Sequence, residues 1–150
     1  MAWFERKLEE KNTRIYILEQ DGERIGQARV DLEGQNGEIS YALCLRARGH
    51  GYSKWMLGSI EEELREQAVC RKLIAEVKRE NIASQKIFET LSYIAVPADY
   101  GYVFEKKIPL FTIIMCTYNS AQTLATAVES VRNQEFGGWE MQILDNGSKD

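Results

Sequence analysis

The fold is decided by the run Arg46-Ala47-Arg48-Gly49-His50-Gly51-Tyr52-Ser53-Lys54. Residues 38–45 before it have the apolar pattern of a strand, and the residues after it repeat with the spacing of an amphipathic helix. The repeating positions are Ser53, Met56, Leu57, Ile60 and Leu64. Glycines at such a junction let backbone amides surround an anion at a helix N-terminus, where the helix dipole favours negative charge. The run therefore predicts a phosphate cradle, and a plain connection between strand and helix is the alternative.

A second strand and helix follow the first pair. Residues 72–79 have the pattern of a buried strand, and Asn81 is a good N-cap for a helix that ends near Tyr93. The apolar face of that helix carries Ser84, Ile87, Phe88 and Leu91. On the first helix, Glu61 and Arg65 are four residues apart, and we expect them to pair on the solvent side.

These two segments together resemble the GNAT N-acetyltransferases, which carry an Arg/Gln-x-x-Gly-x-Gly/Ala motif, then a strand and an Asn-capped helix. The resemblance covers about residues 2–107. Two registers of the motif fit, one starting at Arg46 and one at Arg48. We prefer the second, because residues 44–47 supply the extra residues that the family usually places before its motif. In this register Ser53 stands where the family usually has Gly or Ala.

The resemblance implies acetyl-CoA as cosubstrate. The cradle residues would hold its pyrophosphate through backbone amides; they are Arg48, Gly49, His50, Gly51, Tyr52, Ser53 and Lys54. The backbone of Tyr41, Ala42 and Leu43 would pair with the amide-rich pantetheine arm like an added strand. Asn81 matches the family's asparagine near the thiol, and Ser84 is assigned to the same site. Asn81 could also act only as a helix cap, and the two roles are compatible.

The resemblance also suggests catalytic residues. Glu76, five residues before Asn81, matches the base of the ribosomal-protein N-acetyltransferase branch, and Glu38 is the rival candidate. Either carboxylate could instead be a solvated charge at a strand end. Many relatives carry a tyrosine acid where this chain has Phe88, which we expect in the core. His50 is expected to face solvent or phosphate rather than act as a base.

The fold class expected is α/β: the GNAT fold, with a mixed, mostly antiparallel sheet flanked by helices and an appended βαβ fragment. Residues 1–8 resemble the end of the family's second helix, so the domain at 1–107 is expected to lack its first strand and helix. Alternating residues around Asp21-Gly22 predict a hairpin. Residues 93–107 predict two short strands.

The sequence changes character at residue 108. A strand over 108–117, a helix over 120–134 and a strand over 141–144 predict a βαβ unit. Residues 117–119 and the run from Asp145 to Asp150 resemble the start of the family-2 nucleotide-sugar glycosyltransferases. Thr117 to Asn119 and Asp145 would then face a uridine. The family's metal-binding Asp-x-Asp would lie beyond residue 150, so glycosyl transfer and a metal site are not expected, and a plain α/β fragment is the alternative.

Composition narrows the function. A net charge of −4 without a basic patch argues against a nucleic-acid partner. Cys44, Cys70 and Cys116 lack metal-ligand spacing, so buried reduced thiols are expected. The charged start is not a signal peptide, and no apolar run is long enough to span a bilayer, so a cytoplasmic protein is expected.

The predicted function is acetyl transfer to a primary amine, carried by a small molecule. The glycosyltransferase-like tail favours an amino sugar, or a nucleotide-linked amino sugar of a surface-glycan pathway. The segment Ile25-Gly26-Gln27-x-Arg29-x-Asp31 is similar to one in the aminosugar N-acetyltransferases of nonulosonic-acid pathways. The alternatives are a protein N-terminal or lysine acetyltransferase and an inactive acetyl-CoA-binding module. A homodimer could bury the sheet surface that missing elements would expose.

Overall fold

The computed structural model describes residues 12–150, which fall into two compact units, the first ending at Ile108 and the second beginning at Pro109. The helix end expected at residues 1–8 lies outside the described residues. None of the helices in the described part of the chain is long and apolar enough to cross a membrane.

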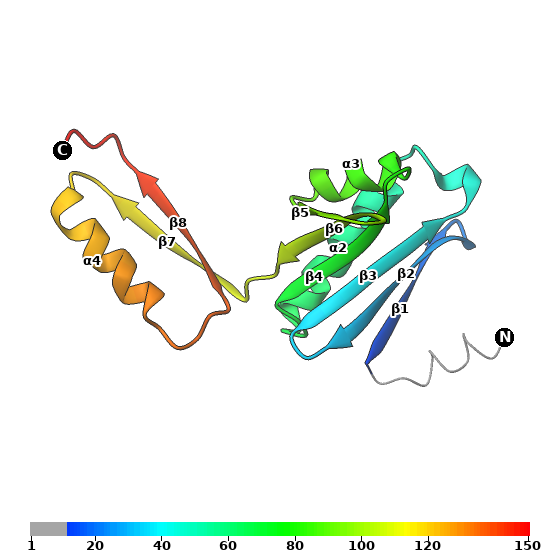
Figure 1. Cartoon of the computed structure of the whole chain (residues 1–150), viewed down its shortest axis with the longest axis horizontal. Helices are drawn as coiled ribbons and strands as arrows, with labels where there is room; N and C mark the ends of the chain where they lie inside the picture. The colour runs from blue at the N-terminus through cyan, green and yellow to red at the C-terminus, as the bar shows by residue number, and fades with distance from the viewer. Residues whose placement is uncertain (1–11) are drawn as a thin grey trace. The chain divides into compact units, whose positions relative to one another are not determined.

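The first unit is built on a six-stranded sheet in the order β1-β2-β3-β4-β6-β5 (Figure 1). Its strands are β1 (Thr13–Gln20), β2 (Glu23–Glu33), β3 (Asn36–Leu43), β4 (Lys72–Lys78), β5 (Ile94–Ala98) and β6 (Gly101–Lys107). All pairs are antiparallel except β3 with β4. The predicted hairpin is confirmed: Asp21 and Gly22 both have positive φ, as its tight turn requires. The expected mixed, mostly antiparallel α/β fold is therefore confirmed.

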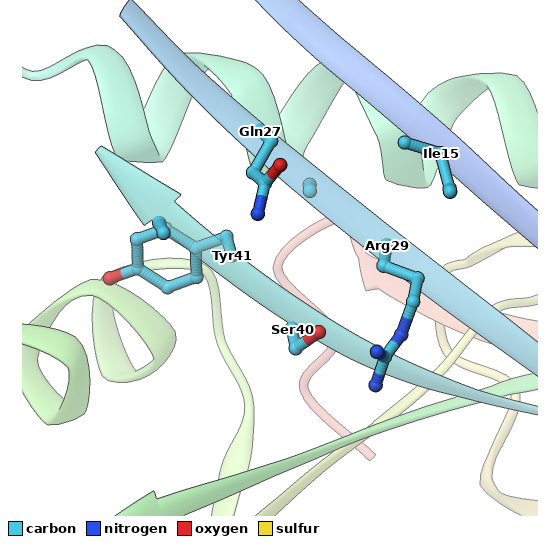
Figure 2. A pocket seen from close by; sticks show the side chains of 7 residues that line it. Ile15, Gln27, Arg29, Ser40 and Tyr41 are labelled. Atoms are coloured by element: carbon cyan, nitrogen blue, oxygen red, sulfur yellow. The ribbon is translucent and has the colours of Figure 1, made fainter. Parts of the chain in front are cut away.

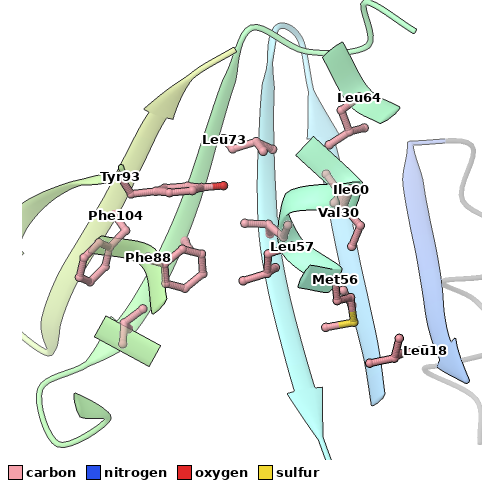
Figure 3. Close-up of a cluster of buried hydrophobic side chains, with 14 of the residues drawn as sticks. Leu18, Val30, Met56, Leu57, Ile60, Leu64, Leu73, Phe88, Tyr93 and Phe104 are labelled. Carbon is pink, nitrogen blue, oxygen red and sulfur yellow. The ribbon is translucent and has the colours of Figure 1, made fainter. Parts of the chain in front are cut away.

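Two helices, α2 (Tyr52–Glu66) and α3 (Ile82–Thr90), follow β3 and β4. A short 3₁₀ turn, η1 (Leu45–Ala47), joins β3 to the loop before α2. The helices pack on one face of the sheet, and their buried side chains meet those of the strands (Figure 3). The predicted helix faces are confirmed, because Leu57 and Leu64 are fully buried and Phe88 is 2% exposed. The opposite face, which we call the outer face, carries the alternate residues of each strand.

The predicted pair of Glu61 and Arg65 is wrong. Glu61 is only 8% exposed, and its Oε2 accepts a hydrogen bond from Lys106 Nζ of β6 at 2.5 Å. Arg65 instead lies 3.5 Å from Glu62. Glu61 borders the buried stripe of α2, where an ion pair with the sheet compensates for lost hydration. Helical spacing cannot report a partner that comes from another element.

The second unit contains β7 (Phe111–Thr117), α4 (Ala121–Arg132) and β8 (Trp139–Asp145). β7 and β8 pair in parallel, so the predicted βαβ unit is confirmed.

The expectation of buried thiols holds for Cys70 and is wrong for Cys44 and Cys116, which are exposed. Cys44 follows the end of β3, and Cys116 lies with Ile114 on the more exposed face of a two-stranded sheet.

Candidate functional site

A gap between β3 and β4 is the main feature of the first unit. The parallel ladder has three pairs, Asn36 with Lys72, Gly37 with Leu73 and Glu38 with Ile74. β3 stays paired with β2 and β4 with β6 along their lengths, so each strand is held from its other side. Beyond the ladder, the edge of residues 39–43 faces no partner strand among the described residues. An edge with free amides and carbonyls accepts an extended, amide-bearing ligand.

The loop between η1 and α2 has the geometry of an anion cradle. Gly49 and Gly51 both have a φ of +80°, a conformation that favours glycine. Gly51 is the N-cap of α2 and offers no side chain to the first helical amides. A Cβ at Gly49 or Gly51 would meet nothing within 4 Å, so the surroundings of the loop at these Cβ positions are open. These features fit a phosphate group at the helix N-terminus.

The side chains of the cradle lie around this loop. Arg48 Nε donates to the carbonyl of Leu43 at 3.4 Å and so ties the loop to the end of β3. The rings of His50 and Tyr52 have centroids 5.9 Å apart. Ser53, in the first turn of α2, is buried, and Lys54 is exposed.

The N-terminus of α3 forms the other wall of the gap. Asn81 is the N-cap, and its Oδ1 accepts a hydrogen bond from the Ser84 amide at 3.2 Å. The Ser84 Oγ lies 3.0 Å from the Tyr41 hydroxyl, so a side chain of β3 reaches α3. Figure 2 shows the Tyr41 ring pointing from its strand toward that helix. The structure thus brings Tyr41, Asn81 and Ser84 together, with Ala42 and Leu43 following along the same strand edge.

Phe88 is a core residue, as predicted. Its ring packs against Tyr93 and Phe104 (Figure 3), with centroid distances of 4.9 Å and 5.5 Å. It also meets the Tyr41 ring at a centroid distance of 6.0 Å. Because phenylalanine has no exchangeable proton, this position supplies no acid.

Glu38 and Glu76 lie on the outer face, near the point where the ladder ends. They line one cavity of about 170 Å³, together with residues of β2 and Ile74. Sequence reasoning missed Tyr100, in the turn between β5 and β6. A hydrogen bond to Glu76 raises the pKa of Tyr100, with smaller contributions from burial and from the charges of Glu76 and Glu38. The local sequence indicated only a turn at Asp99 to Gly101. The pairing of β4 with β6, which brings Tyr100 toward Glu76, could not be predicted from the sequence.

A second cavity, of about 240 Å³, is lined by residues of β1, β2 and β3 (Figure 2). Its lining consists of Ile15, Gln27, Ala28, Arg29, Ser40, Tyr41 and Ala42. Gln27, Arg29 and Ser40 provide polar groups, and Arg29 forms an ion pair with Asp31 at 2.7 Å. The sequence indicated Gln27 and Arg29, because they belong to the segment similar to one in aminosugar N-acetyltransferases. Ser40 was not predicted, because it lies beside them only through the pairing of β2 with β3.

In the second unit, the loops that follow β7 and β8 are bonded to each other. The Asn119 amide donates to Ser148 Oγ at 2.8 Å, and the Lys149 amide donates to Asn119 Oδ1 at 2.9 Å. Hydrogen bonds from the Ser148 hydroxyl and amide hold the pKa of Asp145 below its usual range. The predicted residues Thr117, Asn119 and Asp145 therefore meet at the carboxyl end of the two strands.

Comparison with known families decides the identity of the first unit. Residues 1–93 match the family model described as Acetyltransferase (GNAT) family, over more than half of the chain. The chain belongs to the GNAT acetyltransferase family. This GNAT protein is an N-acetyltransferase, and acetyl-CoA is its cosubstrate. Residues 112–150 match a second model, described as Glycosyl transferase family 2. No curated protein matched the chain.

Solved structures share the fold of this GNAT chain. The ribosomal-protein-S18-alanine N-acetyltransferase of Escherichia coli is 18% identical, with a TM-score of 0.62 over 71% of this chain and 76% of that one. The GNAT domain of S. lividans PAT is 20% identical, with a TM-score of 0.65 over 71% and 68%. The N-acetyltransferase PseH of Campylobacter jejuni, solved with acetyl coenzyme A, is 16% identical, with a TM-score of 0.62 over 71% and 75%.

Proposed function

We propose that this protein transfers the acetyl group of acetyl-CoA to the primary amine of an amino sugar, in nucleotide-linked form, for a surface glycan. The observation that carries the proposal is the cavity over β1, β2 and β3, which Gln27, Arg29 and Ser40 line together. Amide, hydroxyl and guanidinium groups are the partners that sugar hydroxyls and phosphates bind. The fold neighbour PseH, described as an N-acetyltransferase, is compatible with this proposal.

Acetyl-CoA would bind in the gap. The open amides of residues 49–54 are proposed to hold its pyrophosphate, and the position of Gly51 as N-cap of α2 supports the register that starts at Arg48. The backbone of Tyr41, Ala42 and Leu43 would pair with the pantetheine arm, and Asn81 would contact the cofactor near its thiol end.

The carboxylates at the end of the ladder are the proposed bases. The attacking amine must lose a proton, and a carboxylate within reach, directly or through one water, can accept it. Glu76 is our first candidate, because its position five residues before the N-cap Asn81 matches the base of the ribosomal-protein N-acetyltransferase branch, and Glu38 remains the second. Holding the amine close to the thioester supplies much of the remaining acceleration.

Protein N-terminal acetylation is the second candidate function. The observation that favours it is the acidic lining of the cavity that contains Glu38 and Glu76, which would attract the ammonium of a polypeptide N-terminus. The fold neighbour from Escherichia coli is described as a ribosomal-protein-S18-alanine N-acetyltransferase.

We also propose that residues 1–107 form the acetyltransferase domain and residues 108–150 the start of a nucleotide-sugar domain. The match to glycosyltransferases and the bonded loops around Asp145 support the second assignment. A sugar-handling neighbour in the same chain favours a sugar acceptor. We place the reaction in the cytoplasm, where acetyl-CoA and nucleotide sugars are available; a homodimer stays a prediction.

The test is an acetyl-transfer assay that follows release of the CoA thiol with two acceptors, UDP-glucosamine and a peptide that begins with alanine. We expect transfer to UDP-glucosamine, and we expect Arg29→Ala to raise its KM by about tenfold, the usual effect of losing one charge-assisted hydrogen bond. Arg24→Ala, on an exposed hairpin residue, is the matched control. Transfer to the peptide alone would favour the second function.

A further inference from the structure

We propose that the Tyr41 hydroxyl donates the proton that the CoA sulfur takes up when the thioester breaks. This inference rests on the proposed binding of acetyl-CoA in the gap. Phe88, on the adjoining helix, has no proton to give, so the reaction needs another donor or must release a bare thiolate. Tyr41 comes from the strand edge that would bind the pantetheine arm, and its hydroxyl crosses to the helix on the other wall.

The Tyr41 ring is fixed at both ends. Its face-to-edge contact with Phe88 has an interplanar angle of 70° and a centroid distance of 6.0 Å. Its hydroxyl lies 3.0 Å from Ser84 Oγ, and the Ser84 backbone is tied in turn to Asn81. A side chain that is held in one orientation loses little freedom when it acts on a bound substrate.

The contact between the Tyr41 and Ser84 hydroxyls leaves the phenolic proton of Tyr41 available for transfer. Either hydroxyl can donate in the contact between Tyr41 and Ser84. When Ser84 donates to the Tyr41 oxygen, the phenolic O–H is free to point into the gap. Tyr100 differs in this respect, because it lies in the turn between β5 and β6, where its interaction with the Glu76 carboxylate raises its pKa.

The two proton-transfer groups would then lie on different faces of the sheet. Tyr41 has the orientation of Ile39 and Leu43, toward the helices, whereas Glu38 and Glu76 lie on the outer face. An amine that approaches from the outer face would give its proton to a carboxylate there. The thiol would leave toward the helices, on the side of the sheet where Tyr41 lies. The acid and the base would therefore transfer two different protons.

The reaction balances with these groups. The amine nitrogen forms a bond to the thioester carbonyl carbon and loses one proton to the carboxylate. The C–S bond then breaks, its electron pair goes to sulfur, and sulfur takes the phenolic proton of Tyr41 to become the CoA thiol. The Tyr41 phenolate regains a proton from water, and the carboxylate returns its proton to water.

The experiment compares the full chain with its Tyr41→Phe variant, which keeps the ring. We expect kcat for acetyl transfer to UDP-glucosamine to fall by about 10²-fold, the low end for general acid catalysis, because a thiolate is a tolerable leaving group. The Kd for acetyl-CoA, measured by calorimetry, should change by less than about twofold if Tyr41 acts mainly in the transition state. Tyr102→Phe, which removes a phenol hydroxyl on β6, is the matched control.

The outcomes separate the inference from the proposed function. If the unmodified chain binds acetyl-CoA but acetylates neither UDP-glucosamine nor the alanine peptide, the proposed function fails and the inference falls with it. If the unmodified chain is active and Tyr41→Phe keeps its kcat within about twofold, or loses activity only through weaker acetyl-CoA binding, the inference alone is overturned.

Discussion

Glu38 of β3 lies opposite Ile74 of β4 in the last pair of the parallel ladder. This single relationship places three parts of the site. It marks where the gap for an extended ligand begins, it puts Glu38 at the mouth of that gap, and it puts Glu76 two residues further along β4 on the same face. Because β2 and β6 hold the two strands from outside, the gap does not depend on a ligand to keep it open.

Asn81 should serve both the helix and the cofactor. Asn81→Ala removes the hydrogen bond from the Ser84 amide and should lower the free energy of unfolding by about 1 kcal/mol, measured by urea denaturation. Asn81→Asp keeps a capping oxygen, so we expect near-normal stability but weaker acetyl-CoA binding. An Asp variant that binds acetyl-CoA as the unmodified chain does would show that Asn81 is only a cap.

The contact between Glu76 and Tyr100 should be visible by titration. A nearby carboxylate favours the neutral phenol, which is why the pKa of Tyr100 is raised above its ordinary value of about 10. Glu76→Gln removes that charge and should lower the pKa of Tyr100. The measurement is the ultraviolet absorbance of tyrosinate against pH, with a Tyr100→Phe variant to isolate the signal. An unchanged titration in Glu76→Gln would contradict the contact.

Phe88 should matter for stability. Phe88→Ala removes a side chain that is 2% exposed and packed among three other rings, and we expect a loss of about 3–5 kcal/mol in the free energy of unfolding. Ile82→Ala, at a position of the same helix that is 53% exposed, should cost far less. Equal effects of the two changes would mean that α3 does not pack as described.

Local sequence patterns predicted the parts of the site that depend on neighbouring residues. The glycines of the cradle, the Asn81 cap and the apolar faces of α2 and α3 all follow from spacing and backbone preference. The hairpin at Asp21-Gly22 does so as well. These features need no knowledge of distant segments.

The features that sequence reasoning missed depend on which strands become neighbours. β6 lies between β4 and β5, and this order brings Lys106 to Glu61 and Tyr100 to Glu76. The contact of Tyr41 with Ser84 joins residues 43 positions apart. No periodicity in one segment indicates such a partner, so the ion pair of Glu61 with Lys106, the place of Tyr100 and the contact of the Tyr41 hydroxyl with Ser84 were found only in the structure.

The most direct test of the account is acetyl-CoA binding by calorimetry to the full chain and to its Gly51→Glu variant. Gly22→Glu is a close control, because Gly22 also has a φ of +80° and open space around its Cβ position, so the backbone strain is matched. We predict binding by the unmodified chain and by Gly22→Glu, and loss of binding in Gly51→Glu, where a carboxylate would meet the pyrophosphate. Undiminished binding by a folded Gly51→Glu variant would contradict the cradle and, with it, the placement of acetyl-CoA in the gap.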